Sequence, residues 1–132
     1  MKLVLQGRHS FGCGVACVAM MAGVSYGVAQ QAIFGRPSER STQTKDLIRG
    51  LRRLGIKTAG KRLKLLGKST LQELRCNAIV KVPRPGYAMW HWVVWDEQRN
   101  RILDPEGKKT KRFRPTSYLP IGLSKVNQAP NA

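Results

Sequence analysis

The fold is decided at residues 6–21, which read Gln6-Gly-Arg-His-Ser-Phe-Gly-Cys13-Gly-Val-Ala-Cys-Val-Ala-Met-Met21. Polar residues and glycines lead up to Cys13, and the small, apolar residues after it predict a short buried helix over residues 13–21. A helix that begins at Cys13 places the thiol where unpaired backbone N–H groups and the helix dipole favour an anion. The thiolate is the nucleophilic form of cysteine. Cys13 is therefore a candidate nucleophile, and Gln6 is a candidate oxyanion donor through its side-chain amide.

A candidate base for this nucleophile lies in the second half of the chain. His91 is part of Met89-Trp-His-Trp-Val-Val-Trp95, whose aromatic and β-branched residues predict a buried strand. Turn-forming residues follow, and the strand pattern resumes at residues 101–103, which together predict a β-hairpin. With a loop of about four residues, Asp104 is expected directly across the ladder from His91 and on the same face. Its carboxylate could then fix the imidazole tautomer, while Pro105 holds Asp104 extended and helps to end the strand.

These motifs, in this order, resemble a known family. Gln6, then Cys13-Gly14 opening a small-residue helix, then His91-Trp-Val-Val, then Leu103-Asp104-Pro105 is similar to the papain-like cysteine peptidases. It most resembles those that cut bacteriocin leader peptides after a double glycine, and the resemblance covers roughly residues 3–105. It implies a papain-like fold and four roles, namely oxyanion donor, nucleophile, general base and orienting acid, for Gln6, Cys13, His91 and Asp104 respectively.

The sequence departs from the family pattern in two places. Gly12 stands where the family often has an acidic residue, and the spacing from Gln6 to Cys13 is one residue longer than usual. Family members are usually joined to a membrane transporter, whereas no run of this sequence approaches the length of a transmembrane helix. The same four groups also serve deamidation, transglutamination and cell-wall amide cleavage, so the expected substrate is stated only as a peptide or protein.

The pattern of elements predicts an α+β domain over residues 1–124, with a frayed tail at 125–132. A second helix is expected at residues 25–34, with Ser25 as its N-cap. A third is expected to end at Leu54 and to begin at its N-cap, either Thr42 or Thr44. A short helix is expected at residues 69–74. Strands are expected at 56–65 and 76–82. The inward residues are expected to be Val28, Ala29, Ala32 and Ile33 in the second helix, and Leu47, Ile48, Leu51 and Leu54 in the third.

The net charge is +17, from 24 basic and seven acidic residues. Self-repulsion on this scale must be offset, which favours an acidic partner: nucleic acid, an anionic surface or an acidic protein. The sequence has no zinc finger, phosphate loop or RNA-recognition motif, so nucleic acid would be held only by non-specific phosphate attraction. The tryptophans around His91 are interpreted as core residues and not as base-stacking platforms. The candidate partner-binding residues are Arg52, Arg53, Lys57, Lys61, Arg62, Lys64, Lys108, Lys109, Lys111 and Arg112.

The three cysteines show no disulfide pattern, which favours a reducing, cytoplasmic location. The alternative is export, because the N-terminal stretch has the basic, apolar and small-residue succession of a signal peptide. Cys17 is interpreted as a small core residue. A metal site from His9, Cys13, Cys17 and His91 matches no usual zinc spacing, so neither metal nor cofactor is expected.

Two functions from different classes are therefore expected. The first is a cysteine peptidase or a related thiol-dependent amide hydrolase or acyl transferase that uses Cys13, His91, Asp104 and Gln6. The alternative is a basic binding protein, such as a phage- or toxin-type effector, that keeps the scaffold and grips nucleic acid or an acidic protein. Dependence on ionic strength separates the two, because binding through basic clusters weakens steeply with salt.

Overall fold

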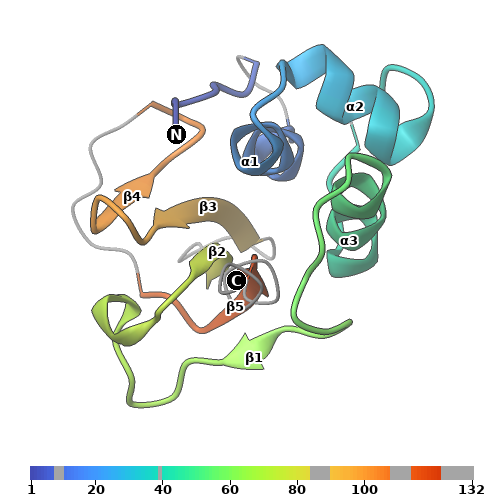
Figure 1. Cartoon of the computed structure of the whole chain (residues 1–132). Coiled ribbons are helices and arrows are strands. Elements are labelled where there is room, and N and C mark those ends of the chain that lie inside the picture. The colour runs from blue at the N-terminus through green and yellow to red at the C-terminus, as the bar shows by residue number, and fades with distance from the viewer. Residues whose placement is uncertain (8–10, 39, 84–89, 108–113, 123–132) are drawn as a thin grey trace, which may run out of the picture.

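The computed structural model describes residues 1–7, 11–38, 40–83, 90–107 and 114–122. They form an α+β fold in which three helices precede a five-stranded antiparallel sheet of order β1-β5-β2-β3-β4 (Figure 1). This confirms the predicted α+β class. The elements are α1 (Cys13–Ala22), α2 (Tyr26–Phe34), α3 (Thr44–Arg53), β1 (Lys64–Leu65), a 3₁₀ turn (Leu71–Glu73), β2 (Asn77–Pro83), β3 (Trp90–Asp96), β4 (Arg101–Leu103) and β5 (Ser117–Ile121).

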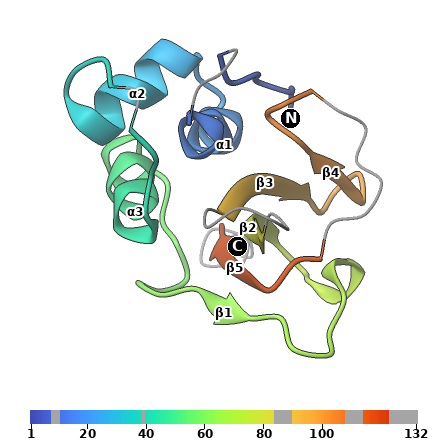
Figure 2. The same cartoon turned by 180° about the vertical axis from the view of Figure 1, so that it is seen from behind.

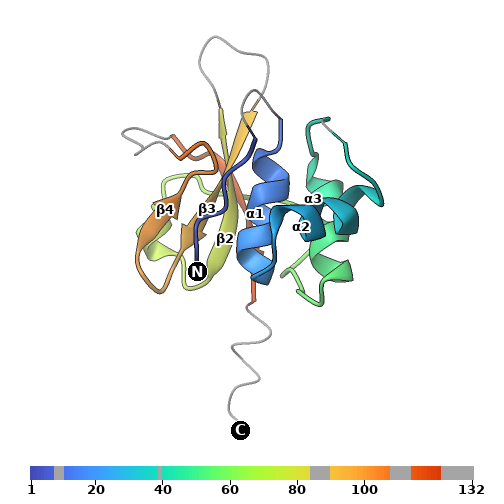
Figure 3. The same ribbon diagram turned by 90° about the horizontal axis from the view of Figure 1, so that it is seen from above.

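Helix α1 is the centre of the molecule. It lies between the sheet and the other two helices (Figure 3), and every residue from Gly14 to Met20 is buried. Small side chains allow this close packing: a Cβ on Gly14 would collide with the hydroxyl of Thr42. The prediction of a buried helix that begins at Cys13 is confirmed.

Helix α2 begins as predicted but packs through fewer residues. The Ser25 hydroxyl accepts a hydrogen bond from the Val28 amide at 3.2 Å, which is the expected N-cap. Ala29 and Ile33 are buried, whereas Val28 is 48% exposed and Ala32 is only partly buried. The prediction that Val28 points inward is therefore wrong, because Val28 lies in the first turn of α2, on the side away from the core.

Helix α3 has a different cap from the one predicted. Its N-cap is Gln43, and a capping box with Asp46 replaces the expected Thr42 or Thr44 cap. Asp46 accepts the Gln43 amide at 2.8 Å, so the cap needs a carboxylate at the third helical position and no hydroxyl. Burial confirms the expected apolar stripe for Leu47, Ile48 and Leu51, whereas Leu54, the C-cap residue, is only partly buried.

The segment that follows α3 is not the long strand predicted at 56–65. Only residues 64–65 form β1, and Thr58 makes one isolated bridge to Ile121. Gly60 has a φ of +151°, and bends surround it, so the chain cannot follow its neighbour for ten residues. The helix expected at 69–74 is a single 3₁₀ turn, and the strand expected at 76–82 is β2, displaced by one residue.

The sheet separates two apolar clusters, and β3 contributes to both. Trp92 and Val94 pack with the helices, while Val93 and Trp95 pack on the opposite face. There they meet Leu71, from the turn that Figure 2 shows at the edge of the molecule, and other residues of the 66–74 segment. Burial of Trp92 and Trp95 confirms the interpretation of these two tryptophans as core residues.

The part of the chain that the structure describes contains no single helix with the length and apolar character to cross a membrane. Helices α1 and α2 reach that threshold only if they are joined, and they are bent by 109° relative to each other. The predicted tail at 125–132 lies outside the described residues.

Candidate active site

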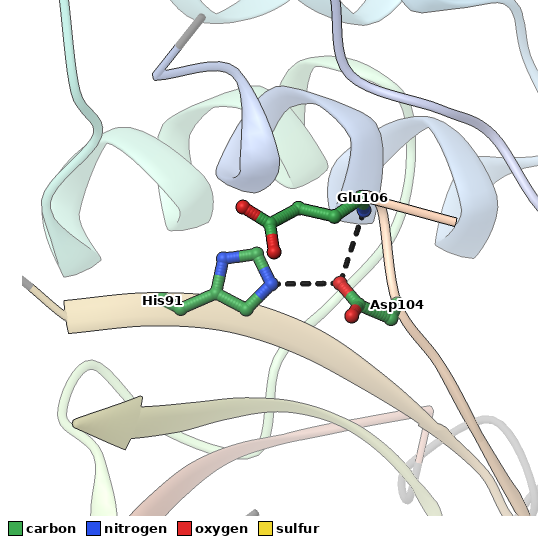
Figure 4. A group of neighbouring side chains, drawn as sticks. All are labelled: His91, Asp104 and Glu106. Atoms are coloured by element: carbon green, nitrogen blue, oxygen red, sulfur yellow. Dashed lines mark hydrogen bonds and ion pairs between the residues drawn. The ribbon is translucent and has the colours of Figure 1, made fainter. Parts of the chain in front are cut away.

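The site is organised by a buried pair on β3 and the turn after β4. Nε2 of His91 lies 2.7 Å from Oδ1 of Asp104, and the two residues are only 3% and 6% exposed (Figure 4). A carboxylate on Nε2 holds the proton on that nitrogen, which leaves Nδ1 as the nitrogen that can accept a proton from an acid. The pair therefore has the geometry of a base and its orienting group.

The hairpin places Asp104 differently from the prediction. The predicted four-residue loop is confirmed, because Asp96 pairs with Arg101 and residues 97–100 connect them. This register carried onward would set Val93, not His91, opposite residue 104. The prediction that Asp104 lies directly across from His91 is therefore wrong: β4 ends at Leu103, and Asp104 reaches the imidazole from a turn.

That turn is built by short-range hydrogen bonds. The Gly107 amide donates to the Asp104 carbonyl at 2.8 Å, and the Glu106 amide donates to Oδ1 of Asp104 at 3.0 Å. Gly107 has a φ of +77°, a conformation that glycine adopts without strain. The ladder ends at Leu103, two residues before Pro105, and the Pro105 carbonyl accepts the backbone N–H of Gln6 at 2.9 Å.

Cys13 completes the group at the start of α1. Its side chain is partly exposed, whereas His91 and Asp104 are buried. Burial lowers the pKa of His91, but the hydrogen bonds that its ring makes with Asp104 and Cys13, and the charges of both, outweigh this and raise the pKa to about 9. With this pKa the imidazole is positively charged at neutral pH, and it lies between the Asp104 carboxylate and the Cys13 sulfur.

Gln6 is brought to the same region by its backbone. The hydrogen bond to Pro105 fixes the N-terminal segment beside the turn that carries Asp104, and Oε1 of Gln6 is buried. The side-chain amide of Gln6 as an oxyanion donor stays a prediction. The second donor expected at this site is the backbone N–H of Cys13, which as a first-turn amide has no partner within the helix.

Glu106 is a residue of this site that the sequence analysis missed. Its side chain extends back over the imidazole, and ligand atoms of Glu106, His91 and Asp104 lie within 4.8 Å of one another (Figure 4). The ladder ends at Leu103, and the turn at 104–107 brings Glu106 to the imidazole, so the strand pattern of the sequence carries no signal for this residue.

Metal binding through the two atoms that now share a hydrogen bond, His91 Nε2 and Asp104 Oδ1, would require these atoms to move apart. Ligands at about 2.0–2.2 Å from one ion are separated by roughly 3 Å or more, whereas His91 Nε2 and Asp104 Oδ1 are 2.7 Å apart. As it stands, the group is a hydrogen-bonded acid–base cluster. His9, the other histidine considered as a ligand, lies outside the described residues.

The other two cysteines are core residues. Cys17 is fully buried one turn below Cys13, and burial, then the charges of Cys13 and Asp104, raise the pKa of its thiol. Cys76 is 7% exposed, and its thiol pKa is raised, again chiefly by burial. Both are poor nucleophiles in the folded protein.

The basic residues proposed for partner binding fall in two groups. Arg52 and Arg53 are in the last turn of α3, and Lys57, Lys61, Arg62 and Lys64 follow in the next segment. The remaining candidates, Lys108, Lys109, Lys111 and Arg112, lie outside the described residues.

Comparison with known proteins adds no assignment: neither a scan against protein-family models nor a search of curated proteins found a match.

Proposed function

We propose that this chain is a cysteine peptidase, or a related thiol-dependent amide hydrolase or acyl transferase, with a papain-like fold. The observation that carries the proposal is the buried His91–Asp104 pair facing the thiol at the N-terminus of α1. The order of elements supports the fold, since helices come first and the strand bearing the base follows. The resemblance of the sequence motifs to bacteriocin-leader peptidases points to the same class.

The geometry supports a two-step acyl transfer. The Cys13 sulfur attacks the substrate carbonyl carbon, and the carbonyl oxygen takes up the negative charge. The amide of Cys13 and the side chain of Gln6 donate hydrogen bonds to that oxygen. Collapse of this intermediate breaks the C–N bond, and the His91 imidazolium gives its proton to the leaving amine. Water or an amine, deprotonated by the now neutral His91, then attacks the thioester and releases Cys13.

Burial and charge support the remaining proposed roles. Asp104 keeps the imidazole oriented and stabilises its protonated form, as the third member of a triad does. Partial exposure of Cys13 leaves the sulfur reachable, while the base and acid are shielded from water.

Limited labelling with iodoacetamide near neutral pH, followed by intact-mass and peptide mass spectrometry, tests the proposal. We expect one fast modification, on Cys13, and none on Cys17 or Cys76, because their buried thiols resist ionisation. We expect His91→Ala and His91→Gln to slow labelling of Cys13 by about tenfold or more, because each removes the cation that favours the thiolate.

The buried cysteines also report on folding. A variant that unfolds exposes Cys17 and Cys76 to the reagent. If a His91 variant is labelled slowly at all three cysteines, its fold is therefore retained. Cys13→Ala should abolish the fast modification. Two results would contradict a thiol-dependent enzyme. One is equal labelling of all three cysteines in the wild-type protein, and the other is a rate of Cys13 labelling that neither His91 variant changes.

A further inference from the structure

The outer face of α3 and the segment after it enclose a groove. Two adjoining cavities, of about 490 and 500 Å³, share Ile48, Arg52 and Lys61 in their walls. They are therefore treated as one feature, the α3 groove. Six cations line it: Lys45, Arg49, Arg52, Arg53, Lys57 and Lys61.

Among the residues that the structure describes, no acidic side chain lines this groove. The one acid of α3, Asp46, is 1% exposed and is bound by Arg40 and Arg49 at 3.1 and 2.8 Å. Asp46 therefore offsets the charge of Arg49, and among the described residues the charges of the other five groove cations are not neutralised from within. A concave surface lined by one sign of charge attracts ligands of the opposite sign.

Part of the cationic lining is held in place. Arg49 donates to the Ile33 carbonyl from Nε and Nη2, at 3.0 and 2.9 Å, and Arg53 donates to the Ala32 carbonyl at 2.9 Å. The other four cations make no side-chain hydrogen bond or ion pair within the described part of the chain, and those four are Lys45, Arg52, Lys57 and Lys61. Two fixed guanidinium groups and four uncommitted cations leave several charges available for a ligand.

The groove also has an apolar component. Ile48, which is 9% exposed, lines both cavities. Ile56, which is partly buried, lines the cavity of about 500 Å³. Within the described part of the chain no aromatic side chain lines either cavity, so these residues offer no platform on which a nucleic-acid base could stack. A ligand that combines carboxylates with an aliphatic side chain matches this lining better than a phosphate backbone does.

We propose that the α3 groove binds an acidic peptide segment of a partner protein. Glutamate or aspartate side chains pair with the free cations, and a neighbouring aliphatic side chain packs on Ile48 and Ile56. The groove residues belong to α3 and residues 55–61, whereas the thiol site belongs to α1, β3 and the turn after β4. Binding here is therefore independent of the thiol chemistry.

Fluorescence anisotropy with labelled probes tests the proposal. The probes are a glutamate–leucine peptide, a glutamine–leucine peptide of equal length, and a thymidine oligonucleotide with the same number of negative charges as the first. We expect the glutamate–leucine peptide to bind most tightly and to weaken as salt is raised. The charge reversal Arg52→Glu with Lys61→Glu is expected to weaken it about tenfold or more.

A matched variant separates the contribution of the groove residues to binding from that of the net charge. Lys68→Glu with Arg75→Glu changes the net charge by the same amount at exposed positions elsewhere, and should weaken binding by less than about twofold. Equal losses in the two variants would show diffuse attraction and overturn the groove. If the oligonucleotide binds more tightly than the glutamate–leucine peptide and the groove variant loses this binding, the surface is assigned to nucleic acid instead. Absence of binding by every probe would also refute the proposal.

Discussion

Asp104 holds His91 through one short hydrogen bond, and the charge of the histidine depends on it. Burial alone would lower the pKa of His91, and the Asp104 and Cys13 partners raise it to about 9. We expect Asp104→Asn to bring this pKa down substantially, because the negative partner is removed while the burial remains. NMR titration of the imidazole between about pH 5 and 10 measures the change.

The same shift makes stability depend on pH. A folded-state pKa above the ordinary 6.5 contributes stability that is complete below pH 6.5 and is lost as pH rises towards 9. Asp104→Asn should therefore flatten the decline of stability over that interval. Glu97→Gln, the same chemical change at an exposed hairpin position, should leave both the titration and the decline unchanged. An Asp104→Asn titration that still centres near 9 would assign the shift to Cys13 instead.

Single residues of the site differ in how far the sequence could predict them. Cys13 and His91 can be identified from the sequence alone. Cys13 stands at the junction of a polar and an apolar segment, and His91 stands among strand-forming residues. The contact of Asp104 with His91 was predicted, but the backbone position of Asp104 was not. Asp104 lies in a turn with Pro105 and Gly107 and not in the β-ladder. Glu106 was missed because a charged residue in a turn is normally read as solvated.

At the scale of elements, the start of α3 is fixed by one buried carboxylate. Burial raises the pKa of Asp46, but hydrogen bonds from Arg40, the Gln43 amide and Arg49, with the charge of Arg40, hold it below its usual 3.8. We expect Asp46→Asn to lower the free energy of unfolding by about 2 kcal/mol at neutral pH. Urea unfolding monitored by circular dichroism gives the value.

The pH profile and a second capping box serve as checks on this cap. A depressed pKa contributes stability above pH 3.8 that disappears as pH falls through the folded-state value, so wild type and Asp46→Asn should converge in acid. Glu73 caps the 3₁₀ turn through the Thr70 amide at 3.0 Å, but from an exposed position. Glu73→Gln should therefore cost less than about 1 kcal/mol, and an equal cost in the two variants would show that burial of Asp46 adds nothing.

Elements with a strong local period were predicted well, and those without one were not. The apolar stripe of α3 and the run of aromatic and β-branched residues in β3 were predicted to be buried, and Leu47, Ile48, Leu51 and residues 91–95 are buried. Residues 56–65 alternate only weakly, and the glycine at 60 breaks the backbone, so tertiary contacts leave a loop with one bridge. Val28 shows the converse error: an apolar residue at a helical position need not face the core.

At the scale of the whole molecule, charge is the dominant feature. Few of the basic side chains form an ion pair with an acidic one. Among the described residues, the aspartates that pair with arginine or histidine are Asp46, Asp96 and Asp104. With a net charge of +17, the folded state brings like charges together that the unfolded chain keeps apart. Mobile ions screen this repulsion over about 10 Å at 0.1 M salt.

We therefore expect salt to stabilise the fold while it weakens binding at the α3 groove. Raising NaCl from about 50 to 500 mM should increase the unfolding midpoint by about 3 °C or more, measured by differential scanning fluorimetry. The Lys68→Glu, Arg75→Glu variant carries less charge to screen, so its gain should be smaller. A midpoint that falls with salt in both proteins would mean that ion pairs outweigh repulsion. The cations would then be part of what holds the fold together, and the need for an acidic partner would lose its physical basis.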